Sequence, residues 1–270
     1  MIGEGAPAAS LARARPPQGE PLLRVEGLVK QYGGVRAVDQ VAFDLAAASI
    51  TGLIGPNGAG KSTVLAVVSG FTPATAGRVS LGGEDLSSAP MHVRARRGLA
   101  RTFQIARVFG GLTALENLVV AVPGQRALTA RGLLEGRRRW RAQEQDLIER
   151  AYRLLASFGM AEIANQRART LSGGQRRAVE IMRALMMEPL LLLLDEPMAG
   201  LNPHLVGQLE DIFVSLRERG ITLLLIEHEL DTVERICGEV LVMAWGKVIA
   251  RGAMAELRQR REVQDAYVVG

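Results

Sequence analysis

The sequence predicts an α/β fold built on a mostly parallel β-sheet. Two short, strongly apolar runs, LLLLL at 190–194 and ITLLLI at 221–226, have the length of buried strands. They alternate with helix-periodic segments around 204–219 and 229–237. Apolar strands that alternate with helices are typical of a parallel sheet that is covered on both faces.

Two further patterns predict an antiparallel β portion and an inserted α-helical subdomain. Between 22 and 45, and again at 77–86, short β-like runs are separated by glycine turns. From about 91 to 185 the segments are arginine-rich and helix-periodic, with few strand signals. A β-hairpin is predicted at 240–252, and because the chain has no internal repeat we expect one copy of this fold.

These changes of pattern divide the chain into four parts. We expect a mobile extension at 1–21, because this stretch is rich in Ala, Pro and Arg and lacks the apolar core of a signal peptide. The other expected parts are a core formed by 22–90 and 186–252, a helical subdomain at 91–185 and a C-terminal tail at 253–270.

The composition of the chain says more about its cellular compartment than about its binding partner. The 270 residues are 48% hydrophobic and carry a formal charge of +5, which suits nucleic acid, an anionic nucleotide or an acidic membrane face equally. The only cysteine, Cys237, excludes an intrachain disulfide and agrees with a reducing compartment. The apolar runs are far shorter than the roughly 20 residues of a membrane-spanning helix, so we expect a soluble chain that depends on another polypeptide for any membrane crossing.

The stretch GPNGAGKST lies between an apolar strand and a helix, which is the setting of a phosphate-binding loop. Its glycines let successive N–H groups point at phosphate oxygens, and the helix N-terminus adds partial positive charge. We expect Lys61 to reach the β- and γ-phosphates and the Ser62 hydroxyl to ligate Mg²⁺. The expected nucleotide-binding residues are Gly55, Pro56, Asn57, Gly58, Ala59, Gly60, Lys61, Ser62 and Thr63.

The strand LLLLLDEP favours a hydrolase over a kinase. Asp195 ends this buried strand, and we expect its carboxylate to hold Mg²⁺ through water. Glu196 follows directly, where a carboxylate beside the γ-phosphate can orient or deprotonate an attacking water. A kinase must keep water out and needs no acid at that position. The core therefore has the features of a nucleoside triphosphate hydrolase.

The stretch LSGGQ at 171–175 is a second glycine-containing helix start, and it has no lysine. Ser172 can cap the helix while the amides of Gly173 and Gly174 face a phosphate. Without a cation the loop suits a second clamp better than a primary site. Because it lies at the end of the helical subdomain, we expect it to act on the nucleotide of a neighbouring subunit, as in a head-to-tail dimer.

The motifs GPNGAGKST, LSGGQ, LLLLLDEP and IEH, in this order and at these separations, resemble those of the nucleotide-binding subunit of an ATP-binding cassette (ABC) transporter. The resemblance covers about 22–270 and implies a P-loop ABC ATPase core with ATP and Mg²⁺ as cofactors. It also implies that the signature loop acts on the partner's ATP, through Ser172, Gly173, Gly174 and Gln175.

The same resemblance implies roles for three more residues. Tyr32 matches the aromatic residue that stacks on adenine, and His228 matches the switch histidine that contacts the γ-phosphate. Gln104 matches the glutamine that touches Mg²⁺ and the attacking water and couples the site to the membrane subunit. From the residues alone, Tyr32 is equally a strand-end aromatic and Gln104 an ordinary surface glutamine. The implied catalytic residues are Lys61, Gln104, Glu196 and His228, and the implied metal-binding residues are Ser62, Gln104 and Asp195.

Longer stretches are similar to the ATP-binding subunits of hydrophobic (branched-chain) amino acid importers: RTFQIARVFGGLTALENL, DEPMAGLNP, LLIEHEL and REVQDAYVVG. This similarity implies membrane-spanning permease subunits, a second ATP-binding subunit that is either a copy or a paralogue, and indirectly a periplasmic or extracellular solute-binding protein. It places the chain at the cytoplasmic face of the membrane as a peripheral subunit. Asn202 stands where many ABC proteins have an aspartate, so a charge at that position is lost.

Alternatives of another class stay open at this point. A non-transport ABC ATPase that acts on DNA or ribosomes would suit the charge, although such proteins usually carry two cassettes or a long coiled coil; we expect no nucleic-acid partner. The arginines of 94–101 adjoin Gln104 and are expected near the surface that couples to a membrane subunit. Those of 137–141 are expected on a solvated helix face, and His92 and His204 at the surface.

Overall fold

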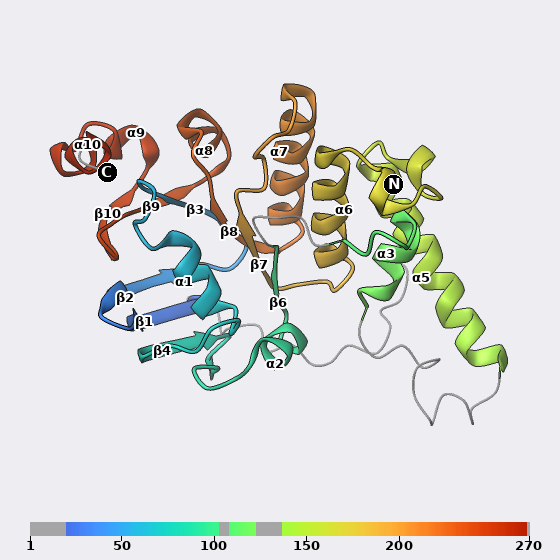
Figure 1. Cartoon of the computed structure of the whole chain (residues 1–270), viewed down its shortest axis with the longest axis horizontal. Helices are drawn as coiled ribbons and strands as arrows, with labels where there is room; N and C mark the ends of the chain where they lie inside the picture. Colours follow the sequence, from blue (N-terminus) through green and yellow to red (C-terminus); the bar gives the residue numbers. More distant parts are fainter. Residues whose placement is uncertain (1–19, 103–107, 123–136, 269–270) are drawn as a thin grey trace.

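A computed structural model describes residues 20–102, 108–122 and 137–268, with the side chains of 137–143 and 268 left undescribed. Nearly all of the predicted N-terminal extension therefore lies outside the described residues, and so do Gln104 and the side chains of the arginines at 137–141. The described part is an α/β fold with two sheets and a separate group of helices (Figure 1).

The larger sheet has six strands in the order β10-β9-β3-β8-β7-β6, and every neighbouring pair except β9 and β10 is parallel. Its strands are β3 (Ile50–Ile54), β6 (Leu99–Arg101), β7 (Leu191–Asp195), β8 (Thr222–Ile226), β9 (Glu239–Ala244) and β10 (Lys247–Gly252). The smaller sheet is antiparallel, in the order β2-β1-β4-β5. Its strands are β1 (Leu23–Tyr32), β2 (Val35–Leu45), β4 (Ala76–Leu81) and β5 (Glu84–Asp85). The predicted mixture of parallel and antiparallel β-structure is confirmed.

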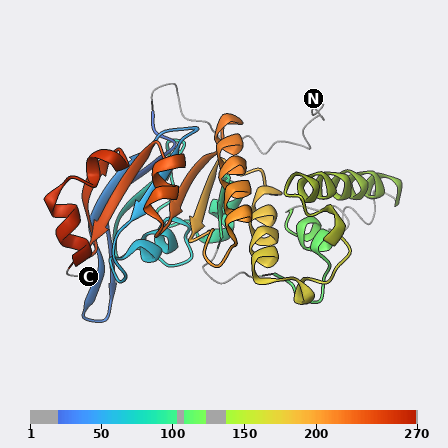
Figure 2. The ribbon, with the colours of Figure 1, turned by 90° about the horizontal axis from the view of Figure 1, so that it is seen from above.

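The helices fall into two groups (Figures 1 and 2). Around the sheets lie α1 (Lys61–Val68), α2 (Met91–Arg96), α7 (Pro203–Glu218), α8 (Leu230–Ile236), α9 (Met254–Leu257) and α10 (Arg261–Val268). Beyond α7 lie α3 (Ala114–Val120), α5 (Arg137–Ser157) and α6 (Gly173–Leu185), with short 3-10 turns at Ala161–Ile163 and Ala168–Thr170. Within the described residues, no helix is long and apolar enough to cross a bilayer.

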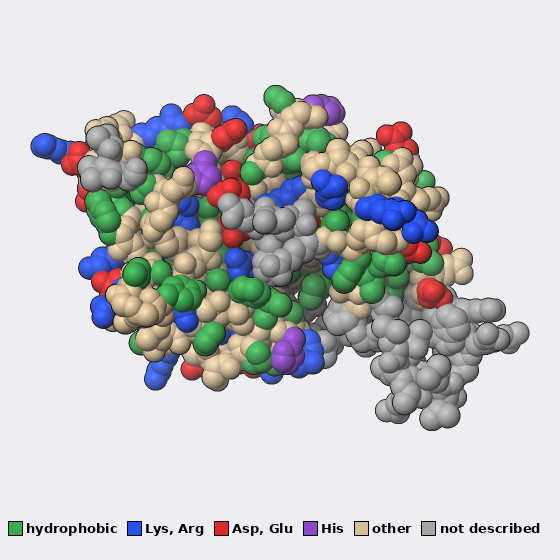
Figure 3. Space-filling view, in the orientation of Figure 1, with side chains coloured by type: hydrophobic (Ala, Val, Ile, Leu, Met, Phe, Trp, Pro, Cys, Tyr) green, Lys and Arg blue, Asp and Glu red, His purple; other side chains and the backbone are tan. Residues whose placement is uncertain are grey.

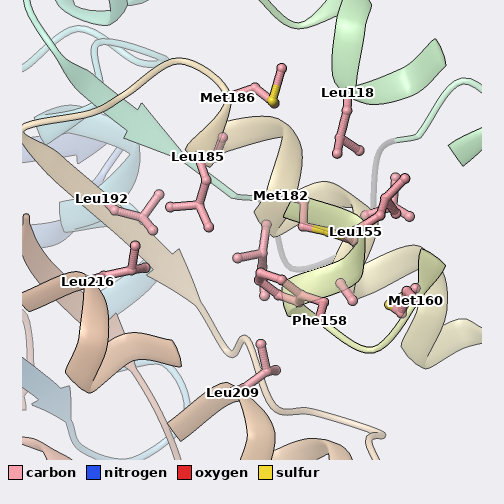
Figure 4. Close-up of a cluster of buried hydrophobic side chains, with 14 of the residues drawn as sticks. Leu118, Leu155, Phe158, Met160, Met182, Leu185, Met186, Leu192, Leu209 and Leu216 are labelled. Atoms are coloured by element: carbon pink, nitrogen blue, oxygen red, sulfur yellow. The ribbon is translucent and has the colours of Figure 1, made fainter. Parts of the chain in front are cut away.

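Strand β7 is apolar throughout because both of its faces are covered. Leu191 and Leu193 pack with β1, β2 and α1 on one face of the sheet. Leu192 and Leu194 point to the other face, into a cluster with side chains of α3, α5, α6 and α7 (Figure 4). Since successive strand residues alternate between faces, only an apolar run satisfies both. This packing fixes the end of β7, where Asp195 and Glu196 follow.

One strand lies where the sequence predicts mainly helix. β6 falls within 91–185 and yet pairs in parallel with β7 at the edge of the six-stranded sheet. Three residues are too few for a strand period to be recognised in a sequence. The division of the chain at Met91 consequently remains a prediction, and the sheet includes part of the segment beyond it.

The expectation of a surface arginine cluster at 94–101 is wrong for two of its members. Arg94 is buried, and its Nη1 donates to the carbonyls of Val67 (2.9 Å) and Val68 (2.6 Å) at the end of α1. Arg101 is also largely buried, at 8% side-chain exposure. Unpaired carbonyls at a helix end attract such donors. Among these arginines only Arg96 and Arg97 are exposed, whereas His92 and His204 are exposed as expected.

Candidate nucleotide site

The phosphate loop owes its shape to glycine. Gly55, Gly58 and Gly60 have φ values of 146°, 81° and 98°, in the left-handed region that disfavours other residues. A Cβ at Gly55 would lie 2.0 Å from the carbonyl oxygen of Met243, and one at Gly60 would lie 2.4 Å from that of Ala37. The loop leads directly into α1, whose N-cap Gly60 supplies no side chain. The first amides of α1 therefore have no side-chain cap and suit an anion.

Lys61 lies under this loop. It is buried, and its Nζ donates to the carbonyl oxygens of Gly55 (2.7 Å) and Pro56 (2.8 Å). Burial lowers the pKa of Lys61, while the carboxylates of Glu196 and Asp195 oppose that shift. An ammonium group held at the centre of the loop can exchange these carbonyls for phosphate oxygens, which carry full negative charge.

Asp195 ends β7 beside the start of α1. Its Oδ1 accepts a hydrogen bond from the Ser62 hydroxyl at 3.1 Å, and its Oδ2 lies 3.3 Å from Nη2 of Arg101. A hydroxyl and a carboxylate oxygen are ligands of the kind that Mg²⁺ accepts. Within the described residues no three His, Cys, Asp or Glu side chains converge on a possible metal site. This pair therefore fits an ion that takes its other ligands from phosphate and water.

Glu196 and His228 face each other across the ends of β7 and β8. The Oε1 of Glu196 lies 2.9 Å from Nε2 of His228, and the two side chains are 19% and 44% exposed. Glu227, which precedes the histidine, is buried and accepts hydrogen bonds from the amides of Met198 (2.9 Å) and His228 (3.4 Å). Burial raises the pKa of Glu227. Glu227 thus holds the histidine segment against the loop that follows Glu196.

The signature loop starts α6 as a capping box. Ser172 Oγ accepts from the Gln175 amide (3.1 Å), and Gln175 Oε1 accepts from the Ser172 amide (2.9 Å), so the predicted cap is confirmed. Ser172 and Gly173 are exposed. In both views α6 and α1 lie on opposite sides of β7 and β8 (Figures 1 and 2). Within one chain, therefore, the sheet separates the signature helix from the phosphate loop.

Comparison with known proteins agrees with this geometry. Residues 38–199 match the family described as ABC transporter. This chain belongs to the ABC transporter family. The BraF high-affinity branched-chain amino acid transport ATP-binding protein of Pseudomonas aeruginosa is 38% identical over 249 residues, which span 92% of this chain and 98% of the relative. The LivG protein of Archaeoglobus fulgidus, described as a probable branched-chain amino acid transport ATP-binding protein, is 36% identical over 247 residues, 92% of this chain and 95% of the relative.

Solved structures of ABC cassettes have the same fold. A nucleotide-free ATP-binding cassette from an ABC transporter aligns with a TM-score of 0.80 at 33% identity, covering 92% of this chain and 98% of that one. An ATP-binding cassette in its ADP conformation aligns with a TM-score of 0.79 at 32% identity, covering 93% and 100%. As an ABC ATPase, this chain binds and hydrolyses ATP. The names of the relatives describe transport subunits, which supports transport over the DNA or ribosome alternative.

The residues that the sequence singles out in this ABC protein are only partly gathered in one place. Lys61, Ser62, Asp195, Glu196 and His228 come together where β3, β7 and β8 end. Tyr32 stands apart at the end of β1, half exposed, with Nζ of Lys30 at 4.8 Å from its ring centre. Gln104 lies outside the described residues. Asn202 caps α7, its side chain accepting from the Leu205 amide at 2.9 Å.

The motifs leave three largely buried residues of the site without an assigned role. Arg101 contacts the carboxylate of Asp195, Arg177 contacts the main chain of Asp195 and Glu196, and Glu227 contacts the amide of Met198. In the sequence, Arg101 and Arg177 are two among many arginines. Only Glu227 has a signal, because it is an acid at the end of a mostly apolar strand and lies beside His228 in the IEH stretch.

Proposed function

We propose that this ABC ATPase energises the import of branched-chain or related amino acids through separate membrane-spanning permease subunits. The observation that carries the proposal is the Glu196–His228 pair, 2.9 Å apart beside Lys61 and Asp195, in a chain whose relatives are named for branched-chain amino acid transport. The chain would be a peripheral subunit at the cytoplasmic face, and a periplasmic or extracellular solute-binding protein would deliver the solute to the permease.

The proposed site divides its tasks among seven side chains. Lys61 and the amides of the phosphate loop bind the β- and γ-phosphates of ATP, and Tyr32 stacks on adenine. Ser62 and Asp195, with Gln104, hold Mg²⁺, which when bound neutralises phosphate charge. Glu196 orients the attacking water and accepts its proton, and His228 contacts the γ-phosphate.

The site is completed by a second cassette. Ser172, Gly173, Gly174 and Gln175 are exposed or half-exposed and lie across the sheet from their own phosphate loop, so we propose that they clamp the γ-phosphate of ATP bound to a partner subunit. ATP then shifts the population toward a closed dimer, because it contacts both subunits only in that state. On the described part of the face shown in Figure 3, basic side chains are scattered among acidic, hydrophobic and other side chains.

The test is light scattering combined with ATP hydrolysis. We expect Glu196→Gln to bind ATP, to lose hydrolysis and to shift from monomer to dimer when Mg-ATP is added. Lys61→Ala, the matched change in the phosphate loop, should instead lose ATP affinity and stay monomeric. If Glu196→Gln hydrolyses ATP at the wild-type rate, the proposed role of Glu196 in activating water is wrong. If Lys61→Ala binds ATP with unchanged affinity, the proposed role of Lys61 in binding phosphate is wrong. A monomer that binds ATP would indicate a paralogous partner.

The amino acid class is tested on the assembled transporter. In vesicles that contain the chain with its permease subunits and binding protein, leucine should stimulate ATP hydrolysis and enter the lumen, and Glu196→Gln should abolish both. If only another solute stimulates ATP hydrolysis, the proposed importer function stands and the proposed substrate is wrong.

A further inference from the structure

The main chain at Glu196 is in an unusual conformation. Glu196 has a φ of 50°, in the left-handed region that non-glycine residues rarely occupy. Such a conformation is unfavourable by itself and persists only where the surrounding structure holds it. One contact comes from the neighbouring strand, since the Glu196 amide donates to the carbonyl of Ile226 at 3.1 Å. A second comes from the Ala199 amide, which donates to the Glu196 carbonyl at 3.2 Å.

A buried arginine of the signature helix supplies further contacts to this main chain. Nη2 of Arg177 donates to the carbonyl oxygen of Asp195 and, at 2.7 Å, to that of Glu196. Nη1 of the same guanidinium donates to Glu180 Oε2 at 3.0 Å, and both side chains are nearly inaccessible, at 6% and 7% exposure. Burying an ion pair costs desolvation free energy. The stability of the fold therefore does not by itself explain why this pair lies against the Glu196 peptide.

We propose that Arg177 is a positioning residue for hydrolysis, which holds the main chain of Asp195 and Glu196 so that the Glu196 carboxylate faces the nucleotide. The inference rests on the proposed role of Glu196. A planar guanidinium has donors in a fixed fork and spans two carbonyls and a carboxylate at once, which an ammonium group cannot do with the same geometry. The Glu196 side chain then reaches His228, 2.9 Å away.

The position of Arg177 on α6 gives this contact a second consequence. Ser172 caps the helix and Arg177 lies five positions later, a rise of about 7.5 Å. One rigid helix thus connects the loop that clamps the partner's ATP to the carboxylate that acts on the chain's own ATP. A displacement of the signature loop moves Arg177, and with it the Glu196 peptide, so the two sites of a dimer are mechanically joined through α6.

The test compares Arg177→Lys with a matched control, Arg150→Lys. Arg150, on α5, also donates to a main-chain carbonyl, that of Met186 at 2.7 Å, and pairs with Glu188 at 2.7 Å, but its contacts are with the other end of α6. We expect kcat for ATP to fall about 100-fold in Arg177→Lys, as for a displaced reacting group, with KM within about twofold because the phosphate loop is intact. Arg150→Lys should keep kcat within about twofold.

A spectroscopic measurement separates positioning from general damage. The chain has three histidines, His92, His204 and His228, so their imidazole NMR signals can be resolved. In Arg177→Lys the His228 signal should shift while those of His92 and His204 stay in place. If Arg177→Lys destabilises the fold, the double variant Arg177→Gln/Glu180→Gln, which removes both charges of this buried pair together, should give the same fall in kcat and the same shift.

The outcomes are distinguishable from those for the proposed function. If Glu196→Gln abolishes hydrolysis while Arg177→Lys hydrolyses ATP at the wild-type rate, or leaves the His228 signal in place, the positioning role is wrong and the proposed function stands. If Glu196→Gln still hydrolyses ATP, the proposed role of Glu196 fails first.

Discussion

The phosphate loop after β3 and the loop after β7 form two sides of the proposed nucleotide site. The conformations of these two loops are stabilised in different ways. The first is shaped by its backbone, since its glycines have φ values of 146°, 81° and 98°, and two of them, Gly55 and Gly60, pass close to carbonyls of other segments. The second is held by side chains from elsewhere: Arg101, Arg177 and Glu227 contact Asp195, Glu196 and Met198. The loop that presents amides is therefore built from contiguous residues, whereas the loop that presents carboxylates is held by side chains that are distant in the sequence.

The largest effect should come from adding a methyl group to the phosphate loop. In Gly55→Ala the new Cβ would lie 2.0 Å from the carbonyl oxygen of Met243, and we expect a loss of roughly 4 kcal/mol of unfolding free energy. Gly58→Ala is the control, because φ is also positive at 81° but nothing lies within 4 Å; it should cost only about 1–2 kcal/mol. If urea denaturation gave equal losses of unfolding free energy for the two variants, the positive φ would explain the need for glycine, and the close approach to Met243 would not.

The next effect concerns the side-chain contacts of the second loop. Arg101→Gln leaves the buried Asp195 carboxylate without its cation, and we expect a loss of about 3 kcal/mol. The exposed pair Arg97–Glu84, at 2.9 Å with side chains 51% and 42% accessible, is the control: Arg97→Gln should cost at most about 1 kcal/mol. In a double-mutant cycle, Asp195→Asn should recover part of the Arg101→Gln loss, and strict additivity would contradict a direct coupling.

The smallest effect is a pH dependence of stability at Glu227. Burial raises the pKa of Glu227 above its ordinary value of 4.5, so above that pH the folded state holds a proton that the unfolded state releases. Stability from this group is therefore complete below the unfolded pKa and is lost as pH rises through the folded pKa. Glu227→Gln should flatten the decline of unfolding free energy as pH rises above the ordinary carboxyl pKa of 4.5. Parallel curves for the two proteins would show that Glu227 carries no such proton.

The sequence by itself determined the local features on which the proposed nucleotide site of this ABC ATPase is built. In GPNGAGKST the glycines, lysine and serine that shape the site are contiguous, and LSGGQ contains its own capping box. The stretch LLLLLDEP also predicts where its two acidic residues lie, because an apolar run buried on both faces ends at Asp195. Each of these features depends on neighbours along the chain, so pattern and spacing suffice to predict them.

Only the tertiary structure decided which arginines are buried and what they hold. The same pattern of basic residues contains Arg94 and Arg101, which donate to α1 and to Asp195, and Arg96 and Arg97, which are exposed. β6 is a strand because β7 lies beside it, and Arg177 reaches the Glu196 peptide from 19 positions away. Burial and charge pairing depend on groups that are distant in sequence, and the folded arrangement alone brings those groups together.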